Sequence, residues 1–231
     1  EKIFLVAHDS DPFNRWDNVQ SLWLEYILSS EQVSKKEMFS MIKNLMTEEG
    51  DFALLSEMIS LPSEQIIHQN VAEIDVEDVH NKRNNALLEI GKKFKDVFLK
   101  TYEKLNFKKP FDLSTDSVAE RALKNTCLAY LTKLGESDIA YQQFIHSDCM
   151  TDQFGAFQSL LSNENSYRDE VIDRFYNEHR SDVQVMDKWF SAQSISSLSS
   201  VDDIKSLMEH ELFTMKNPNR VRSVIGSFSQ N

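Results

Sequence analysis

Glycine and proline are scarce in this chain. Of its 231 residues, 5 are glycine and 4 are proline, against ordinary usage of about 7% and 5%. Tight turns and strand connections depend on these two residue types. Charged residues make up 27% of the chain. The shortage of turn formers, with this charge content, favours a mostly helical protein with short connections.

Cysteine is also rare, and long apolar runs are missing. Cys127 and Cys149 lie far apart without a pairing or metal-binding spacing, which favours reduced structural thiols in a cytoplasmic protein. No apolar run reaches the roughly 18–20 residues of a membrane-spanning helix, so no membrane partner is expected. The net charge is −12. Nucleic acid is not an expected partner either, because phosphate binding needs a basic face.

The two ends of the chain indicate a piece of something longer. Residues 2–7 form a short apolar run with β-branched and aromatic side chains, which predicts one terminal β-strand. A single strand is not stable alone, so residues 1–10 are expected to be the last strand of a preceding β-sandwich domain. The chain does not begin with methionine, and its last residues show no C-cap. The helical domain is therefore expected to be incomplete at its C-terminus.

From residue 11 onward, apolar residues recur at helical spacing, and several helix starts are marked. Ser34 with Glu37 fits a capping box, and Asp51 and Ser63 fit N-caps. Longer periodic segments predict helices over residues 76–105, 116–134, 136–146, 150–161, 166–178, 181–193 and 201–209. The fold predicted for residues 11–231 is all-α, an irregular superhelix of antiparallel helix pairs of the HEAT or armadillo type.

The sequence contains no recognisable catalytic motif. An HExxH zinc site needs two histidines one helical turn apart, with a glutamate as general base. His210-Glu211 begins this pattern, but Thr214 occupies the position of the second histidine. Residues 146–149 place His146 near Cys149 without the second half of a metal site, which is typical of a surface loop. Phosphate-binding glycine loops and the GxSxG motif are missing as well.

One cationic segment remains near the end of the chain. After residue 212 the only charged residues are Lys216, Arg220 and Arg222. Asn217 and Pro218 predict a helix start, where the helix dipole disfavours a cation by about 0.3–1 kcal/mol. Either an anion binds at this helix start, or the arginines pair with carboxylates elsewhere in the fold.

Short motifs across the chain resemble the bacterial aminopeptidase N family of zinc aminopeptidases. The first reads Asp-Ser-Asp-Pro-Phe-Asn-Arg-Trp and resembles the junction before the family's helical domain. The motifs, in the family's order, are Asp9–Trp16, Leu61–Glu64, Arg121–Asn125, Met150–Asp152, Val185–Phe190 and Phe213–Arg220. The resemblance implies that this chain is the end of a β-sandwich and most of a C-terminal helical domain, with the zinc and every catalytic residue upstream.

The resemblance also implies a role for the cationic segment. In this family the helical domain closes over the catalytic domain, encloses a chamber above the zinc and restricts access to peptides. Arg222 is expected to face that chamber. Arg220 is expected nearby or at the domain interface, and Arg220 and Asn219 are the further candidate substrate-binding residues. A guanidinium suits a peptide carboxylate because it binds in a bidentate way and stays charged. The alternative function is a non-enzymatic HEAT-like scaffold that binds another protein.

Overall fold

The computed structural model describes residues 1–28, 34–47, 50–107 and 110–230. Every regular element in these ranges is a helix, as the all-α prediction requires. The chain divides into two compact units, Glu1–Leu134 and the part from Gly135 onward. No helix in the described ranges is both long and apolar enough to span a bilayer.

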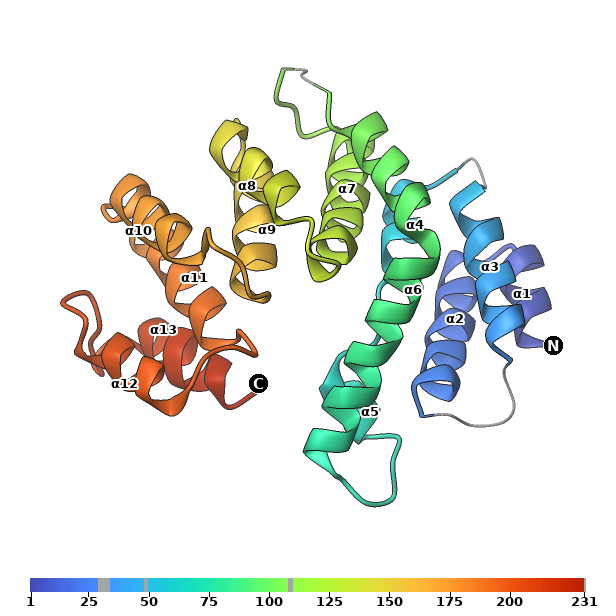
Figure 1. Cartoon of the computed structure of the whole chain (residues 1–231), viewed down its shortest axis with the longest axis horizontal. Coiled ribbons are helices and arrows are strands. Elements are labelled where there is room, and N and C mark those ends of the chain that lie inside the picture. Colours follow the sequence, from blue (N-terminus) through green and yellow to red (C-terminus); the bar gives the residue numbers. More distant parts are fainter. Residues whose placement is uncertain (29–33, 48–49, 108–109, 231) are drawn as a thin grey trace. The chain divides into compact units, whose positions relative to one another are not determined.

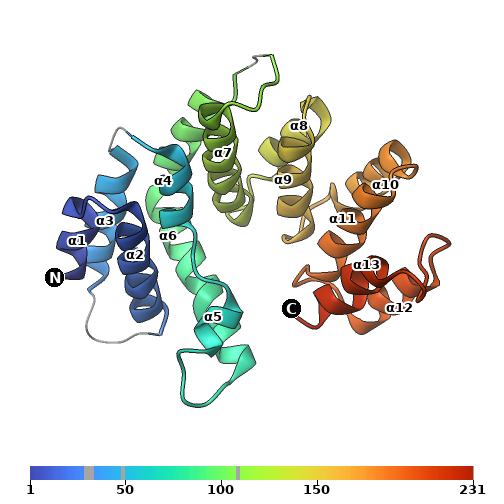
Figure 2. The ribbon, with the colours of Figure 1, turned by 180° about the vertical axis from the view of Figure 1, so that it is seen from behind.

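The first unit contains seven helices in its described residues. They are α1 (Lys2–His8), α2 (Pro12–Ile27), α3 (Lys35–Thr47), α4 (Phe52–Ile59), α5 (Glu64–His68), α6 (Val76–Leu105) and α7 (Thr115–Lys133). The two longest, α6 and α7, lie side by side in both views (Figures 1 and 2). Helix α4 contacts both α2 and α7.

The predicted terminal β-strand is wrong, because residues 2–8 form helix α1. This helix packs on α2 and buries Val6 to 1% exposure. Lys2 pairs with Glu25 of α2, and Arg15 Nε donates to the carbonyl of Val6 at 2.7 Å. A helix satisfies its backbone hydrogen bonds within the segment. Contacts with α2 therefore override the β propensity of the isoleucine, phenylalanine and valine side chains.

The predicted helix starts are confirmed by their caps. Ser34 Oγ accepts from the backbone N–H of Glu37 at 3.3 Å, and Glu37 Oε2 accepts from the N–H of Ser34 at 3.2 Å. The side chain of Asp51 caps α4, and that of Ser63 caps α5. Asp11 adds a cap for α2, directly before Pro12. These interactions are local, so residue order alone was enough to predict them.

Aromatic side chains with polar tips connect three helices of the first unit. Trp23 Nε1 of α2 donates to the carbonyl of Met58 at 2.9 Å, and Tyr130 Oη of α7 donates to the carbonyl of Ile59 at 2.7 Å. These carbonyls belong to the last turn of α4, where a helix leaves its C=O groups without partners. Tyr130 also stacks on Phe98 of α6 with ring centroids 4.5 Å apart. The end of α4 is thereby fixed between α2 and α7.

Helix α6 has the predicted bounds but contains a kink. Phe94 departs from helical geometry, with φ −114° and ψ 17°, and its side chain is buried. One turn earlier, a Cβ at Gly91 would lie 3.3 Å from the side chain of Leu134. A close approach of this kind favours glycine, which has no side chain. Gly135, with φ +94°, follows the last turn of α7 in the left-handed conformation that favours glycine.

The second unit is built around stacked phenylalanines. Its elements are α8 (Ser137–His146), α9 (Met150–Leu161), α10 (Arg168–His179), α11 (Val183–Ser194), α12 (Val201–Glu209), α13 (Pro218–Val221) and the π-helix η1 (Arg222–Gly226). Phe157 of α9 stacks on Phe175 of α10 at 4.5 Å, with Phe144 and Phe154 beside them. Trp189 Nε1 of α11 donates to the carbonyl of Ile172 at 3.0 Å, which ties α11 to α10.

Replacing Tyr130 with phenylalanine tests the junction at the end of α4. The variant Tyr130→Phe keeps the ring but leaves the carbonyl of Ile59 buried without its donor, and we expect a loss of about 1–3 kcal/mol in the free energy of unfolding. Urea unfolding of this chain measures the loss. The matched control is Tyr141→Phe, because Tyr141 Oη bonds an exposed carboxylate, that of Glu170. Equal unfolding midpoints for Tyr130→Phe and the unsubstituted chain would contradict this account.

Candidate functional site

The cationic segment predicted from the sequence lies in the second unit, at the start of α13. Asn217 caps this helix, since its side chain accepts from the backbone N–H groups of Asn219 and Arg220 at 3.0 and 3.4 Å. Pro218 occupies the first helical position. Both features confirm the predicted helix start. Helix α13 is only four residues long and passes directly into η1, so the dipole argument for an anion at this start loses its force.

Arg220 is buried and fully engaged within the second unit. Its side chain is 4% exposed, and Nε donates to Asp187 Oδ1 of α11 at 2.7 Å. Nη1 donates to the carbonyl of Leu212 at 2.9 Å, and Nη2 to that of Val183 at 3.4 Å. The guanidinium also lies 4.6 Å from the ring centroid of Phe190. A buried charge needs a partner of opposite sign and further hydrogen bonds, and Arg220 has both.

This geometry gives Arg220 a structural role within the described residues. Its donors are directed at Asp187, Leu212 and Val183, and its charge is answered by the carboxylate of Asp187, which is 21% exposed. Of the two explanations that the sequence left open, pairing with a carboxylate of the fold therefore holds for Arg220. Its role in the described structure is to hold α13 against α11.

Unlike the buried Arg220, Arg222 and Asn219 have exposed side chains. Two residues along a helix correspond to a rotation of about 200°, so Arg220 and Arg222 face nearly opposite directions. Ser223 and Val224 are buried on the face of Arg220, at the i+3 and i+4 positions that share a helix face. Within the described residues no hydrogen bond or ion pair engages the guanidinium of Arg222. That spacing places the two arginines on different faces of the helix, but it does not show which face is buried.

His210 belongs to a cluster of aromatic rings beside Arg220. Its ring lies 5.2 Å from Tyr176, 5.3 Å from Trp189 and 5.5 Å from Phe190, measured between ring centroids. Nδ1 accepts a hydrogen bond from the backbone N–H of Leu212 at 3.1 Å, which requires that nitrogen to be unprotonated. Burial lowers the pKa of His210, and the charge of Arg220 lowers it further while Glu211 opposes the shift. The structure therefore favours a neutral imidazole at this position.

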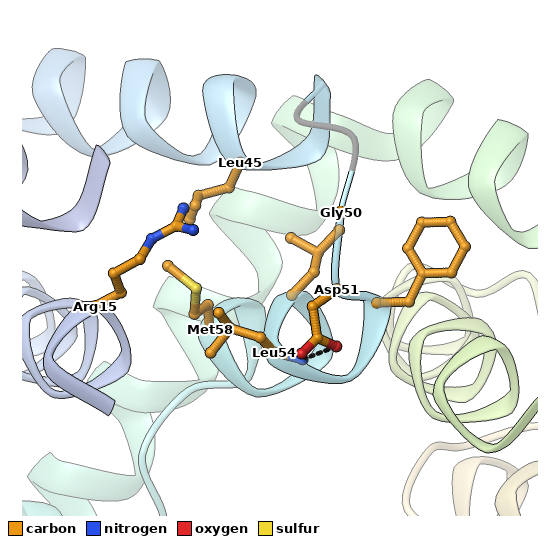
Figure 3. Close-up of a pocket in the computed structure, with 8 residues that line it drawn as sticks. Arg15, Leu45, Gly50, Asp51, Leu54 and Met58 are labelled. Atoms are coloured by element: carbon orange, nitrogen blue, oxygen red, sulfur yellow. Dashed lines mark hydrogen bonds between the residues drawn. The ribbon is translucent and has the colours of Figure 1, made fainter. Parts of the chain in front are cut away.

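A small pocket lies in the first unit, apart from the predicted site residues (Figure 3). Its volume is about 90 Å³, below the roughly 300–1,000 Å³ of small-molecule sites. The guanidinium of Arg15 lies on one side next to Leu45, with Leu54 and Met58 also lining the pocket. Arg15 Nε donates to the carbonyl of Val6, and the carboxylate of Asp51 caps α4. The lining therefore serves the packing of α2, α3 and α4.

The described residues offer no metal site, and the thiol of Cys127 is unreactive. No group of three or more His, Cys, Asp or Glu side chains in the described ranges could hold a metal ion. Burial raises the pKa of the Cys127 thiol to about 12, so it stays protonated and unreactive at neutral pH. A zinc ion does not fit the residues of this part of the chain.

Comparison with known proteins adds a family and several relatives. A family model described as "Domain of unknown function (DUF3458_C) ARM repeats" matches residues 1–231. Aminopeptidase N of Escherichia coli (strain K12) is 30% identical over 240 residues, covering 98% of this chain and 27% of that protein. Aminopeptidase N of Haemophilus influenzae is 27% identical and is likewise covered over 27% of its length. The chain is homologous to the C-terminal portion of these enzymes.

A solved structure shares the fold. The crystal structure of Legionella pneumophila aminopeptidase A in complex with aspartic acid matches with a TM-score of 0.88 at 22% sequence identity. The match covers 100% of this chain and 29% of that one. The chain thus spans a little over a quarter of the length of the proteins it resembles.

The environment of His210 predicts a pH-dependent stability. The folded state lowers the pKa of His210 below its ordinary value of 6.5, so the unfolded chain binds the proton more readily. The stabilising contribution is present above about pH 6.5 and is lost as the pH falls through the lower folded-state pKa. We expect His210→Asn to lose less stability than the unsubstituted chain between pH 7.5 and 5.5, because its amide oxygen can accept the N–H of Leu212 without titrating.

The urea unfolding midpoints at both pH values measure this difference, with His146→Asn at an exposed position as the control. The same pH dependence in His210→Asn and the unsubstituted chain would refute the prediction.

Proposed function

We propose that this chain, which belongs to the DUF3458_C family of ARM-repeat domains, is the helical lid of a zinc-dependent aminopeptidase. In this proposal its helix pairs form a superhelix that closes over a catalytic domain of the same polypeptide. The lid encloses a chamber, restricts access to peptides and contacts them there. The longer cytoplasmic protein releases N-terminal amino acids, and its zinc and catalytic residues lie outside this chain.

The main support is the way the chain matches its relatives. It aligns over 98% of its own length with 27% of an aminopeptidase N, so an aminopeptidase of that kind has most of its chain elsewhere. In this proposal the catalytic zinc lies in the part of the aminopeptidase that this chain does not cover. The contribution of this chain is then binding and access rather than bond cleavage.

The exposed guanidinium of Arg222 supports a role in peptide binding. It is charged at any working pH, and it presents N–H donors in a fork that fits a carboxylate. Asn219 is exposed one helical turn or less away and offers an amide donor and acceptor. A peptide reaching into the chamber from its N-terminus would bring its C-terminal carboxylate to this pair. This interaction favours peptides over substrates without a free carboxylate.

The description of the family as ARM repeats also supports a second candidate. Helical repeats of this kind commonly bind other proteins on an extended surface, so a scaffold without enzymatic activity would use the same fold. In that case Arg222 would face an acidic partner. The gene sequence upstream of this chain distinguishes the two candidate functions, because only the aminopeptidase requires an HExxH zinc motif there.

Arg222→Ala in the full-length protein tests the proposed peptide contact. Removing the guanidinium takes away a charge-assisted bond to the peptide carboxylate, so we expect KM for tri- and tetrapeptides to rise about tenfold. KM for an aminoacyl-arylamide, which has no carboxylate, should stay the same. Steady-state kinetics on both substrates measure the difference, and Arg174→Ala at an exposed position of α10 is the control. Equal effects on both substrates would leave Arg222 with a structural role only.

The isolated chain should be inactive and free of tightly bound zinc. Because the described residues contain no metal-binding group, purified residues 1–231 are expected to show no turnover of a fluorogenic aminoacyl substrate. Elemental analysis after dialysis should find far less than one zinc per chain. The full-length protein prepared in the same way is the positive control. Turnover or stoichiometric zinc in residues 1–231 would disprove the proposed division of labour.

A further inference from the structure

We propose that Asp187 and Arg220 form a positioning pair that sets the direction of Arg222. This inference rests on the proposed function, since it gives the pair a task in peptide binding. Neither residue touches the peptide in this account. They act by fixing the short helix on which Arg222 is presented.

The helix that carries Arg222 is too short to hold its own shape. Helix α13 and η1 follow one another without a break and together have nine residues, fewer than the roughly 12–15 residues below which an isolated helix is marginal in water. A π-helix is itself rare and is frequently found at functional sites. The direction of Arg222, the first residue of η1, must therefore be set by tertiary contacts.

Arg220 supplies those contacts from the opposite face of the same helix. Its guanidinium joins Asp187 in the middle of α11, the carbonyl of Val183 at the start of α11, and the carbonyl of Leu212 after α12. Helices α11, α12 and α13 lie next to one another in both views (Figures 1 and 2). These three hydrogen bonds hold the Arg220 face of the helix toward α11, so the residue two positions on lies on a face directed away from α11.

The turn after α12 is fixed from both sides, which makes it a firm base for Arg220. The N–H of Leu212 donates to His210 Nδ1 at 3.1 Å, while its carbonyl accepts from Arg220. His210 is held in turn by Tyr176, Trp189 and other aromatic neighbours. The backbone N–H and C=O of Leu212 are thus both hydrogen-bonded, to the side chains of His210 and Arg220.

The far end of the π-helix is attached to α11 as well. Val224 is 0% exposed, and the hydroxyl groups of Ser191 and Ser227 lie 2.8 Å apart. Ser223 Oγ donates to the carbonyl of Arg220 at 2.9 Å. Contacts on either side of Arg222 are thus directed to α11, and Arg222 itself is left exposed. Removing the carboxylate of Asp187 would break the attachment at Arg220 and leave the attachment at Val224 and Ser227 in place.

A double-mutant cycle in the full-length protein tests the pair. The variants are Asp187→Asn, Arg222→Ala and both together, with Asp173→Asn at an exposed position of α10 as the control. We expect Asp187→Asn to raise KM for a tripeptide about tenfold, as far as Arg222→Ala does, and to leave an aminoacyl-arylamide unaffected. The double variant should have the same KM for the tripeptide as Arg222→Ala alone. Both substitutions remove the same contact with the peptide, so their effects on KM should not add. Additive effects would overturn the positioning role.

Amide hydrogen exchange on the same proteins separates this inference from the proposed function. Asp187→Asn should raise exchange about tenfold or more over residues 219–226, and leave α9 unchanged. Unchanged exchange over residues 219–226 would overturn the inference whatever the kinetics show. Faster exchange without any effect of Arg222→Ala on peptides would keep the positioning and reject the peptide contact. Arg220→Lys retains the charge but not the fork, and it provides the same readout if Asp187→Asn does not fold.

Discussion

The buried charge of Arg220 is the constraint on which the last part of the second unit depends. A guanidinium that is 4% exposed must have a counter-charge and hydrogen-bond acceptors, because its desolvation is otherwise too costly. Asp187 supplies the charge, and the carbonyls of Val183 and Leu212 supply the acceptors. These interactions hold three segments together: α11, α13 and the turn that follows α12. A helix of four residues then keeps a defined place despite its length.

The position of Arg222 follows from this constraint. The helix geometry that buries Arg220 directs the residue two positions later away from α11, and the burial of Ser223 and Val224 maintains that direction through the π-helix. The electrostatic reasoning from the helix dipole is not needed for either arginine. Arg220 is compensated inside the unit, and the side chain of Arg222 is exposed.

The first unit shows the same division between local and distant causes. Its helix starts at Asp51 and Ser63 depend on side chains that bond their own next residues, and a short stretch of sequence contains all of that information. The end of α4 depends instead on Trp23 and Tyr130, which come from helices on either side in the sequence. Helix α1 is the case where these causes conflict. Its apolar residues have β propensity, and packing on α2 decides in favour of a helix.

The sequence by itself determined the all-α fold, the bounds of the long helices, the capping residues and the family, because each of these depends on residues that are neighbours along the chain or on motifs in order. It also led to the prediction of a binding site in the segment around Asn217 and Arg222. Only the tertiary structure decided between the two arginines. The partner of Arg220 is Asp187, 33 residues earlier, and no local pattern relates these positions. Burial of a charge is a property of the packed helices, so only the structure could show that Arg220 is paired within the fold and that Arg222 is exposed.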